Sequence, residues 1–316
     1  MLALAYDGSL RLVLDQPLPV AGEGDAVIRV TLAGICNTDV EILRGYADFQ
    51  GILGHEFVGV VEDGPDRSLI GKRVAGEINI ACGHCRFCLA GMPTHCACRT
   101  VLGIRGHPGA FAEYLVLPQR NLHVVPDGVA DEDAVFTEPL AAALEILQQV
   151  HVHPDDDVIV LGDGKLGLLV AQVLRLTGCA LEVVGKHPDK LVKASALGVR
   201  TVLAAEIGAR SVDIVVDCTG QPSGFELARA LVRPRGVIVL KSTFHGSAAT
   251  DLSLVVVDEV TIVGSRCGPF AAALRLLGQG LVQLAPLVSA TYPLADAVRA
   301  MKQATVPGVL KVLIKP

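Results

Sequence analysis

The sequence contains few aromatic residues and no long hydrophobic run. Aromatic side chains make up 4% of the 316 residues, and the net charge is -6 with no clustered tract of Lys or Arg. A nucleic-acid-binding protein of this kind needs clustered Lys or Arg to bind the phosphate backbone and aromatic side chains to stack on bases. Because this sequence is poor in both, we expect no nucleic-acid partner. No run of eighteen uncharged apolar residues occurs, and no basic segment precedes an apolar stretch and a cleavage site at the N-terminus. We therefore expect a cytoplasmic protein without membrane contact.

The length and the 51% hydrophobic content favour two domains, each with its own core. Short β-type runs separated by Gly, Pro and Asp fill the first 130 residues, such as "DAVIRVTLAG", "FVGVVED" and "FAEYLVLP". From about residue 138, strands alternate with helices, as in "DDVIVLG", "LGLLVAQVLRLTG" and "ALEVVG". This alternation predicts an α/β fold with a doubly wound parallel sheet. The tail from 282 has a strand, helix, strand pattern that can pack back on the first domain.

A glycine-rich motif, "VIVLGDGKLGLLVAQ", lies between a predicted strand and a predicted helix. Gly162, Gly164 and Gly167 have GxGxxG spacing, which serves a tight turn, the approach of a pyrophosphate and close packing of helix on strand. The N–H groups at the start of the helix then face the phosphates. The further residues predicted to bind the cofactor are Lys165 and Leu166 in the motif, the strand-end residues Gly185, Lys186 and His187, and Thr219.

The end of the second strand, "LEVVGKHPDK", bears on the choice of nicotinamide cofactor. NAD sites usually have Asp or Glu there to bind the ribose 2′-hydroxyl. Here Gly185 takes that position and is followed by Lys186 and His187, while Glu182 lies too early in the strand to replace the carboxylate. A small residue followed by cationic donors leaves room for a 2′-phosphate. The sequence therefore predicts NADP in preference to NAD.

Four of the nine cysteines lie within the segment "CGHCRFCLAGMPTHC". Cysteines of a cytosolic chain are better explained as metal ligands or buried thiols than as disulfides. The Cys-x2-Cys-x2-Cys-x7-Cys spacing predicts a tetrahedral zinc site with no position left for substrate, hence a structural site; an iron–sulfur cluster is the alternative. Its ligands are Cys82, Cys85, Cys88 and Cys96, whereas Cys98 lies just outside the set.

A second, sparser set of potential ligands is spread through the chain. "GICNTD" contains Cys36, Thr38 and Asp39, "GHE" contains His55 and Glu56, and "EPL" contains Glu138. Each residue alone is more often a buried thiol or a core histidine. Together with a nucleotide loop and a cysteine cluster, they indicate a catalytic metal.

In this order, the motifs GICxTD, GHE, the cysteine cluster, EP and GxGxxG resemble the zinc-containing medium-chain dehydrogenase/reductase superfamily, near its sorbitol and threonine dehydrogenase branches. The resemblance spans essentially the whole chain. It implies a GroES-like catalytic domain over residues 1–137, completed by 282–316, and a Rossmann domain over 138–281. It further implies a zinc-dependent oxidoreductase that moves hydride between a secondary alcohol or polyol, or the matching ketone or aldehyde, and NADP(H).

The resemblance also assigns roles to the sparse set. Cys36 and His55 would bind a catalytic zinc, with Glu138 as first choice for the third ligand and Glu56 exchanging with it or lying behind it. Thr38 would pass the proton outward, and Asp39 would orient His55. Where many relatives have a proton-relaying histidine, this chain has Glu41, so the relay can end at Glu41 or directly in solvent. With the cysteine cluster, this makes two zinc ions per chain.

Other functions are open to the same sequence. A catalytically silent relative would keep the nucleotide fold and the structural zinc without the second ligand set, and an NAD-linked polyol dehydrogenase would differ only in its cofactor. A zinc-ribbon nucleic-acid binder would need a basic face, and a zinc-independent quinone reductase would not need the ligands. Members of the resembled family form dimers and tetramers through the edge of the Rossmann sheet, so we expect a homo-oligomer, with "TIVGSRCGPF" as a candidate edge.

Overall fold

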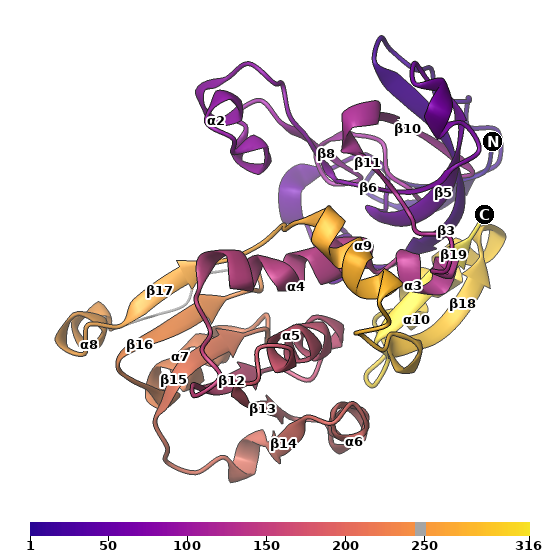
Figure 1. The fold of residues 1–316 in the computed structure, drawn as a ribbon. Coiled ribbons are helices and arrows are strands. Elements are labelled where there is room, and N and C mark those ends of the chain that lie inside the picture. Colours follow the sequence, from indigo (N-terminus) through magenta and orange to yellow (C-terminus); the bar gives the residue numbers. More distant parts are fainter. Residues whose placement is uncertain (244–250) are drawn as a thin grey trace. The chain divides into compact units, whose positions relative to one another are not determined.

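The computed structural model describes residues 1–243 and 251–316, which form two compact units (Figure 1). Unit 1 consists of Met1–Glu138 together with Phe270–Pro316, and unit 2 consists of Pro139–Pro269. Unit 1 is therefore built from both ends of the chain.

The main sheet of unit 1 is mixed and has β3 near its centre. The strand order is β11 (Leu122–Val124), β6 (Arg73–Gly76), β5 (Glu56–Asp63), β3 (Asp25–Gly34), β19 (Lys311–Lys315) and β18 (Val288–Pro293), and β10 (Tyr114–Pro118) also pairs with β3. Over most of β3, buried and less buried positions alternate, as expected where one face of a strand packs on a core. The register places Gly34 opposite both Glu56 and Leu313, so residues from three distant parts of the chain meet at the end of β3.

Smaller elements complete unit 1. The short strands are β1 (Ala3–Tyr6), β2 (Leu10–Val13), β4 (Gly51–Ile52), β7 (Asn79–Ile80), β8 (Thr100–Leu102) and β9 (Gly106–His107). The α-helices are α1 (Asn37–Ile42), α2 (Arg86–Leu89), α3 (Asp131–Ala134), α9 (Phe270–Gly278) and α10 (Ala297–Gln303). The cysteine-rich segment forms the loop between β7 and β8, and the predicted strand, helix, strand pattern of the tail is confirmed as β18, α10 and β19.

Unit 2 is a parallel sheet with alternating helices. Its strand order is β14 (Arg200–Leu203), β13 (Ala180–Gly185), β12 (Asp157–Leu161), β15 (Val212–Asp217), β16 (Val232–Leu240) and β17 (Thr261–Gly264). Its helices are α4 (Thr137–Gln149), which begins at the unit boundary, α5 (Lys165–Arg175), α6 (Pro188–Ala196), α7 (Pro222–Leu231) and α8 (Leu252–Val257). The order reverses between β12 and β15, and such a switch point is where open α/β sheets bind their ligands. The predicted α/β fold class is confirmed.

The second boundary between the two compact units lies at Phe270, where unit 1 resumes and includes α9. The expected nucleotide-binding domain over 138–281 extends beyond this point and stays a prediction. The ring of Phe270 stacks on His123 of β11 with 5.3 Å between centroids, which ties α9 to the main sheet of unit 1. Within the ranges 1–243 and 251–316, no helix has the length and hydropathy required to cross a bilayer.

Candidate active site and metal centres

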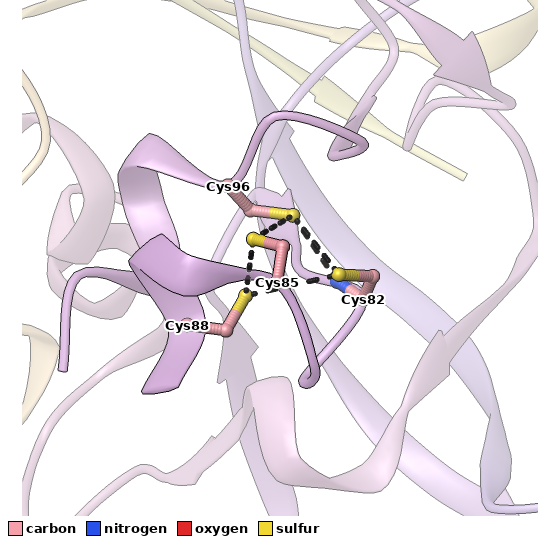
Figure 2. A group of neighbouring side chains, drawn as sticks. All are labelled: Cys82, Cys85, Cys88 and Cys96. Carbon is pink, nitrogen blue, oxygen red and sulfur yellow. Dashed lines mark hydrogen bonds between the residues drawn. The ribbon is translucent and has the colours of Figure 1, made fainter. Parts of the chain in front are cut away.

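The four clustered cysteines point their sulfurs at one another (Figure 2). The Sγ–Sγ separations are 3.5 Å for Cys85–Cys88 and Cys82–Cys96, 3.8 Å for Cys85–Cys96 and 4.0 Å for Cys82–Cys88. A tetrahedral zinc with bonds of about 2.3 Å separates its sulfur ligands by about 3.8 Å. All nine cysteines of the chain are free thiols, and Cys98 is exposed outside the cluster. The geometry therefore fits a closed, four-sulfur metal site.

The backbone around this cluster favours thiolates. N–H groups of Cys88 and Ala97 lower the pKa of Cys85 to about 6, and N–H groups of His84 and Cys85 lower the pKa of Cys82. Burial, followed by the adjacent Cys85 sulfur, raises the pKa of Cys88 to about 12. Four adjacent thiols cannot all ionise, because neighbouring thiolates repel one another. A bound cation would neutralise this repulsion and allow all four to coordinate as thiolates.

A second group of donors lies in unit 1 where β3, β5 and α1 meet. Ligand atoms of Cys36, His55 and Glu56 all lie within 4.8 Å of one another. Cys36 directly precedes α1, His55 directly precedes β5, and Glu56 is the first residue of β5. His55 is 2% exposed and Glu56 is 1% exposed. One thiol, one imidazole and one carboxylate are a donor set suited to a zinc ion that keeps a position open for substrate.

Asp39 and Thr38, in the first turn of α1, support this group. Asp39 is fully buried; one of its carboxylate oxygens accepts the Cys36 N–H at 2.8 Å, and the other lies 3.1 Å from Nδ1 of His55. Burial lowers the pKa of His55, but the negative charges of Asp39 and Cys36 outweigh it and raise that pKa well above its usual value. The hydroxyl of Thr38 lies 3.8 Å from the Cys36 sulfur. The arrangement leaves Nε2 of His55 as the ring nitrogen for a metal.

Lys311 of β19 adds a buried cation that sequence reasoning missed. Its Nζ pairs with Oε2 of Glu56 and lies 3.5 Å from the Ile35 carbonyl oxygen, and it is fully buried. The other oxygen of Glu56, Oε1, is buried and has no hydrogen-bond partner among the described residues. An unpartnered carboxylate oxygen beside a thiol and an imidazole is what a metal site requires. Gly34 makes room for the Glu56 carboxylate, because a Cβ at Gly34 would lie 2.6 Å from Oε2 of Glu56.

Glu138, the first choice for the third ligand, is not part of this group. It is the second residue of α4 and half-buried, and the described residues with donor atoms inside 4.8 Å comprise Cys36, His55 and Glu56. Glu56 follows His55 directly and enters the same strand end, whereas Glu138 comes from a helix. The geometry thus favours Glu56 where the sequence favoured Glu138.

The glycine motif of unit 2 has the predicted local geometry. Gly162 has φ +114°, a conformation that disfavours side chains, and a Cβ on Gly167 would lie 2.0 Å from the Gly162 carbonyl oxygen. Gly164 precedes α5 and has open space where a Cβ would be, so a pyrophosphate can approach the N–H groups at the start of this helix, at Lys165 and Leu166. These residues fit a dinucleotide.

The other predicted cofactor residues follow the neighbouring strands. Gly185 ends β13, and Lys186 and His187 follow it, both exposed. Thr219 lies two residues after β15, where its hydroxyl donates to Asp217 at 2.7 Å. Because the carboxyl ends of parallel strands lie at one edge of the sheet, these residues and the glycine motif share that edge.

Comparison with known proteins identifies the family. Residues 22–127 match the model of the alcohol dehydrogenase GroES-like domain, and residues 166–279 match that of the zinc-binding dehydrogenases. The chain is 31% identical to L-threonine 3-dehydrogenase of Edwardsiella ictaluri, over 89% of each chain. It is 28% identical to sorbitol dehydrogenase of Halalkalibacterium halodurans, over 96% of this chain and 95% of the relative. The chain belongs to the zinc-type medium-chain alcohol dehydrogenases, which are oxidoreductases.

Solved structures show the same fold with nicotinamide cofactors bound. The RspB alcohol dehydrogenase of Escherichia coli CFT073, complexed with NADH, superimposes with a TM-score of 0.93 at 27% identity, over 100% of this chain and 99% of its own. A zinc-binding dehydrogenase of Sinorhizobium meliloti 1021, bound to NADP, gives 0.91 at 26% identity with the same coverage. The expected family and fold class are confirmed, and the relatives include both cofactors.

Proposed function

We propose that the protein is a zinc-dependent dehydrogenase that transfers hydride between a secondary alcohol or polyol, or the matching carbonyl compound, and a nicotinamide dinucleotide. The observation that carries this proposal is the convergence of Cys36, His55 and Glu56 in unit 1. A silent nucleotide-binding relative has no chemical need for three buried donors at one point. The relatives named L-threonine 3-dehydrogenase and sorbitol dehydrogenase support a hydroxylated substrate.

The residues of the second donor group and its neighbours would have different roles in the reaction. Zinc bound by Cys36, His55 and Glu56 would supply Lewis-acid polarisation of the substrate oxygen. Asp39 holds His55 in the tautomer that leaves Nε2 free to coordinate, since a carboxylate at Nδ1 favours a proton there. Thr38 is placed beside the Cys36 sulfur, and its hydroxyl can accept and pass on the proton of the alcohol.

The four-cysteine site would hold the second zinc, without taking part in the reaction. Four sulfurs fill a tetrahedral shell and leave no position for a substrate oxygen. Its loop between β7 and β8 contains the short helix α2 and one 3-10 turn, Pro93–His95, and has little core of its own, so cross-linking by a metal would stabilise it.

A screen of secondary alcohols, polyols and ketones with NAD and NADP tests this function. We expect absorbance at the nicotinamide wavelength to change with at least one compound, and elemental analysis to give two zinc ions per chain. A chain that contains one zinc ion and turns over none of the compounds would instead be the silent relative.

We further propose that the protein is a homo-oligomer joined along β17. This strand is the outer strand of the described part of the sheet in unit 2, and Ile262 on it is 38% exposed. Several apolar side chains of α8 and β17 are exposed: Leu252, Leu254, Val256, Val257 and Ile262. An unpaired edge combined with exposed apolar surface is typical of a subunit interface.

We expect light scattering to give a multiple of the 33.0 kDa chain mass, and Ile262→Lys with Val256→Lys to reduce it to a single chain. A buried Lys at an interface loses its hydration without gaining a partner. Val192→Lys is the control, because Val192 is 68% exposed on α6, away from this edge. A wild-type mass of one chain would contradict the proposal.

A further inference from the structure

A carboxylate from the glycine motif, that of Asp163, lies at the end of β13. Asp163, the residue between Gly162 and Gly164 in the glycine motif, lies across Gly185. A Cβ added at Gly185 would be 2.5 Å from Oδ2 of Asp163 and 2.6 Å from its Cβ. The side chain of Asp163 therefore fills the space that an Asp or Glu side chain at position 185 would occupy.

Asp163 is held there by the turn after β13. Its Oδ2 accepts the backbone N–H groups of Lys186 at 2.8 Å and of His187 at 2.7 Å. Nδ1 of His187 lies 3.0 Å from both carboxylate oxygens. Asp163 is 6% exposed, so this side chain is fixed rather than free in solvent. Oδ2 is thus saturated, while Oδ1 keeps lone pairs for a further donor.

From this geometry we infer that Asp163 determines the cofactor of the proposed dehydrogenase and makes it prefer NAD(H) to NADP(H). The inference rests on the proposed function, because it requires that a dinucleotide lies on the glycine motif. A carboxylate at this strand end accepts a hydrogen bond from a ribose 2′-hydroxyl. The chain supplies it from the motif itself, and Gly185 is the residue that leaves room for it.

A 2′-phosphate is disfavoured at this position for two reasons. It would lie beside the negative charge of Asp163, and like charges in a partly buried site repel strongly. The N–H groups of Lys186 and His187 are the local donors that could bind a phosphate, but both already bind Asp163. The NADP prediction relies on the side chains of Lys186 and His187, which would have to bind the 2′-phosphate without help from these N–H groups. Lys186 is exposed, and the His187 ring faces Asp163.

The carboxylate of β13 itself does not compete for this role. Glu182 lies three residues before the strand end and forms salt bridges with Arg210 and, at 3.3 Å, with Arg200. Asp163 is therefore the acidic group placed at the ribose position.

Direct binding of four nucleotides to the purified zinc-containing protein tests the inference, by calorimetry or nicotinamide fluorescence. The probes are NADH, NADPH, 5′-AMP and 2′,5′-ADP; the last two lack nicotinamide and report the adenosine site independently of catalysis. We expect wild type to bind NADH and 5′-AMP at least about tenfold more tightly than their 2′-phosphorylated counterparts. Asp163→Asn removes the charge and retains the shape, and Asp163→Ser also frees the two N–H groups. Both should reduce the preference at least tenfold.

Asp189→Asn is the matched control, because Asp189 is an exposed carboxylate in the first turn of α6 and its change removes the same charge. This variant should keep the wild-type preference. Equal or tighter binding of NADPH by the wild type, or an unchanged preference in folded Asp163→Ser, would overturn the inference while the proposed dehydrogenase stands. Failure of the wild type to bind any of the four nucleotides would overturn both.

Discussion

Replacement of Cys36 by serine should lower the turnover of this protein by about a thousandfold or more and reduce its zinc content from two ions per chain to one. A neutral hydroxyl is a poor ligand for Zn²⁺ compared with a thiolate. Loss of the metal removes several kcal/mol of stabilisation of the transition state, and each 1.4 kcal/mol corresponds to a factor of ten in rate. Steady-state kinetics on the substrate found by screening, together with elemental analysis, would measure both effects.

Two further cysteine variants make this test specific. Cys98→Ser changes an exposed thiol just outside the cluster and should keep both zinc ions and full turnover. Cys96→Ser changes a buried sulfur of the four-cysteine site and should lower the unfolding temperature and remove the other zinc ion. If Cys36→Ser retained two zinc ions and wild-type turnover, the catalytic assignment would be wrong.

Replacement of Lys311 by methionine should lower the free energy of unfolding by about 3–5 kcal/mol, because it leaves the carboxylate of Glu56 buried without its counter-ion. Methionine fills a similar volume, so the loss is chiefly electrostatic. Chemical denaturation of the protein stripped of metal by a chelator measures it, because a zinc ion bound to Glu56 would itself act as the counter-ion.

A double variant separates charge from packing. In Lys311→Met with Glu56→Gln, neither side chain is charged, and most of the lost stability should return. Turnover should not return, because the third metal donor is then an amide. Lys315→Met on the same strand is the control: Lys315 is exposed, and its change should be worth less than about 0.5 kcal/mol. Equal destabilisation in the single and double variants would show that packing, not the unpaired carboxylate, is responsible.

Most of the local chemistry could be predicted from the sequence because it depends on short spacings. Cys36 and Asp39 are three residues apart, and the first turn of α1 makes them neighbours. The four clustered cysteines lie in one loop, so their spacing alone predicts that the sulfurs can meet. Alternating strands and helices also predicted the parallel sheet of unit 2, since that pattern reflects burial on both faces.

Features that depend on contacts across space could not be predicted in this way. The sequence rule for dinucleotide sites expects an acidic residue at the end of β13, where this chain has Gly185. The side chain of Asp163 reaches the same point from the glycine motif. Lys311 lies 255 residues from Glu56, so no local pattern pairs them. The apolar residues on both sides of Lys311 in "VLKVLIKP" were the signal that could have indicated a buried cation in need of a partner. The choice between Glu56 and Glu138 likewise depends on which side chain enters the strand end.

The position of β19 has a consequence for how the protein is made. This strand comes from the last residues of the chain, yet it lies between β3 and β18 inside the sheet of unit 1. During translation, the whole of unit 2 leaves the ribosome before β19 does, so it can fold while β3 still has an open edge. Glu56 of unit 1 therefore lacks its cation until Lys311 has been synthesised. A transcript that stops before codon 311 would encode every donor of both proposed metal sites and still lack the lysine that neutralises Glu56.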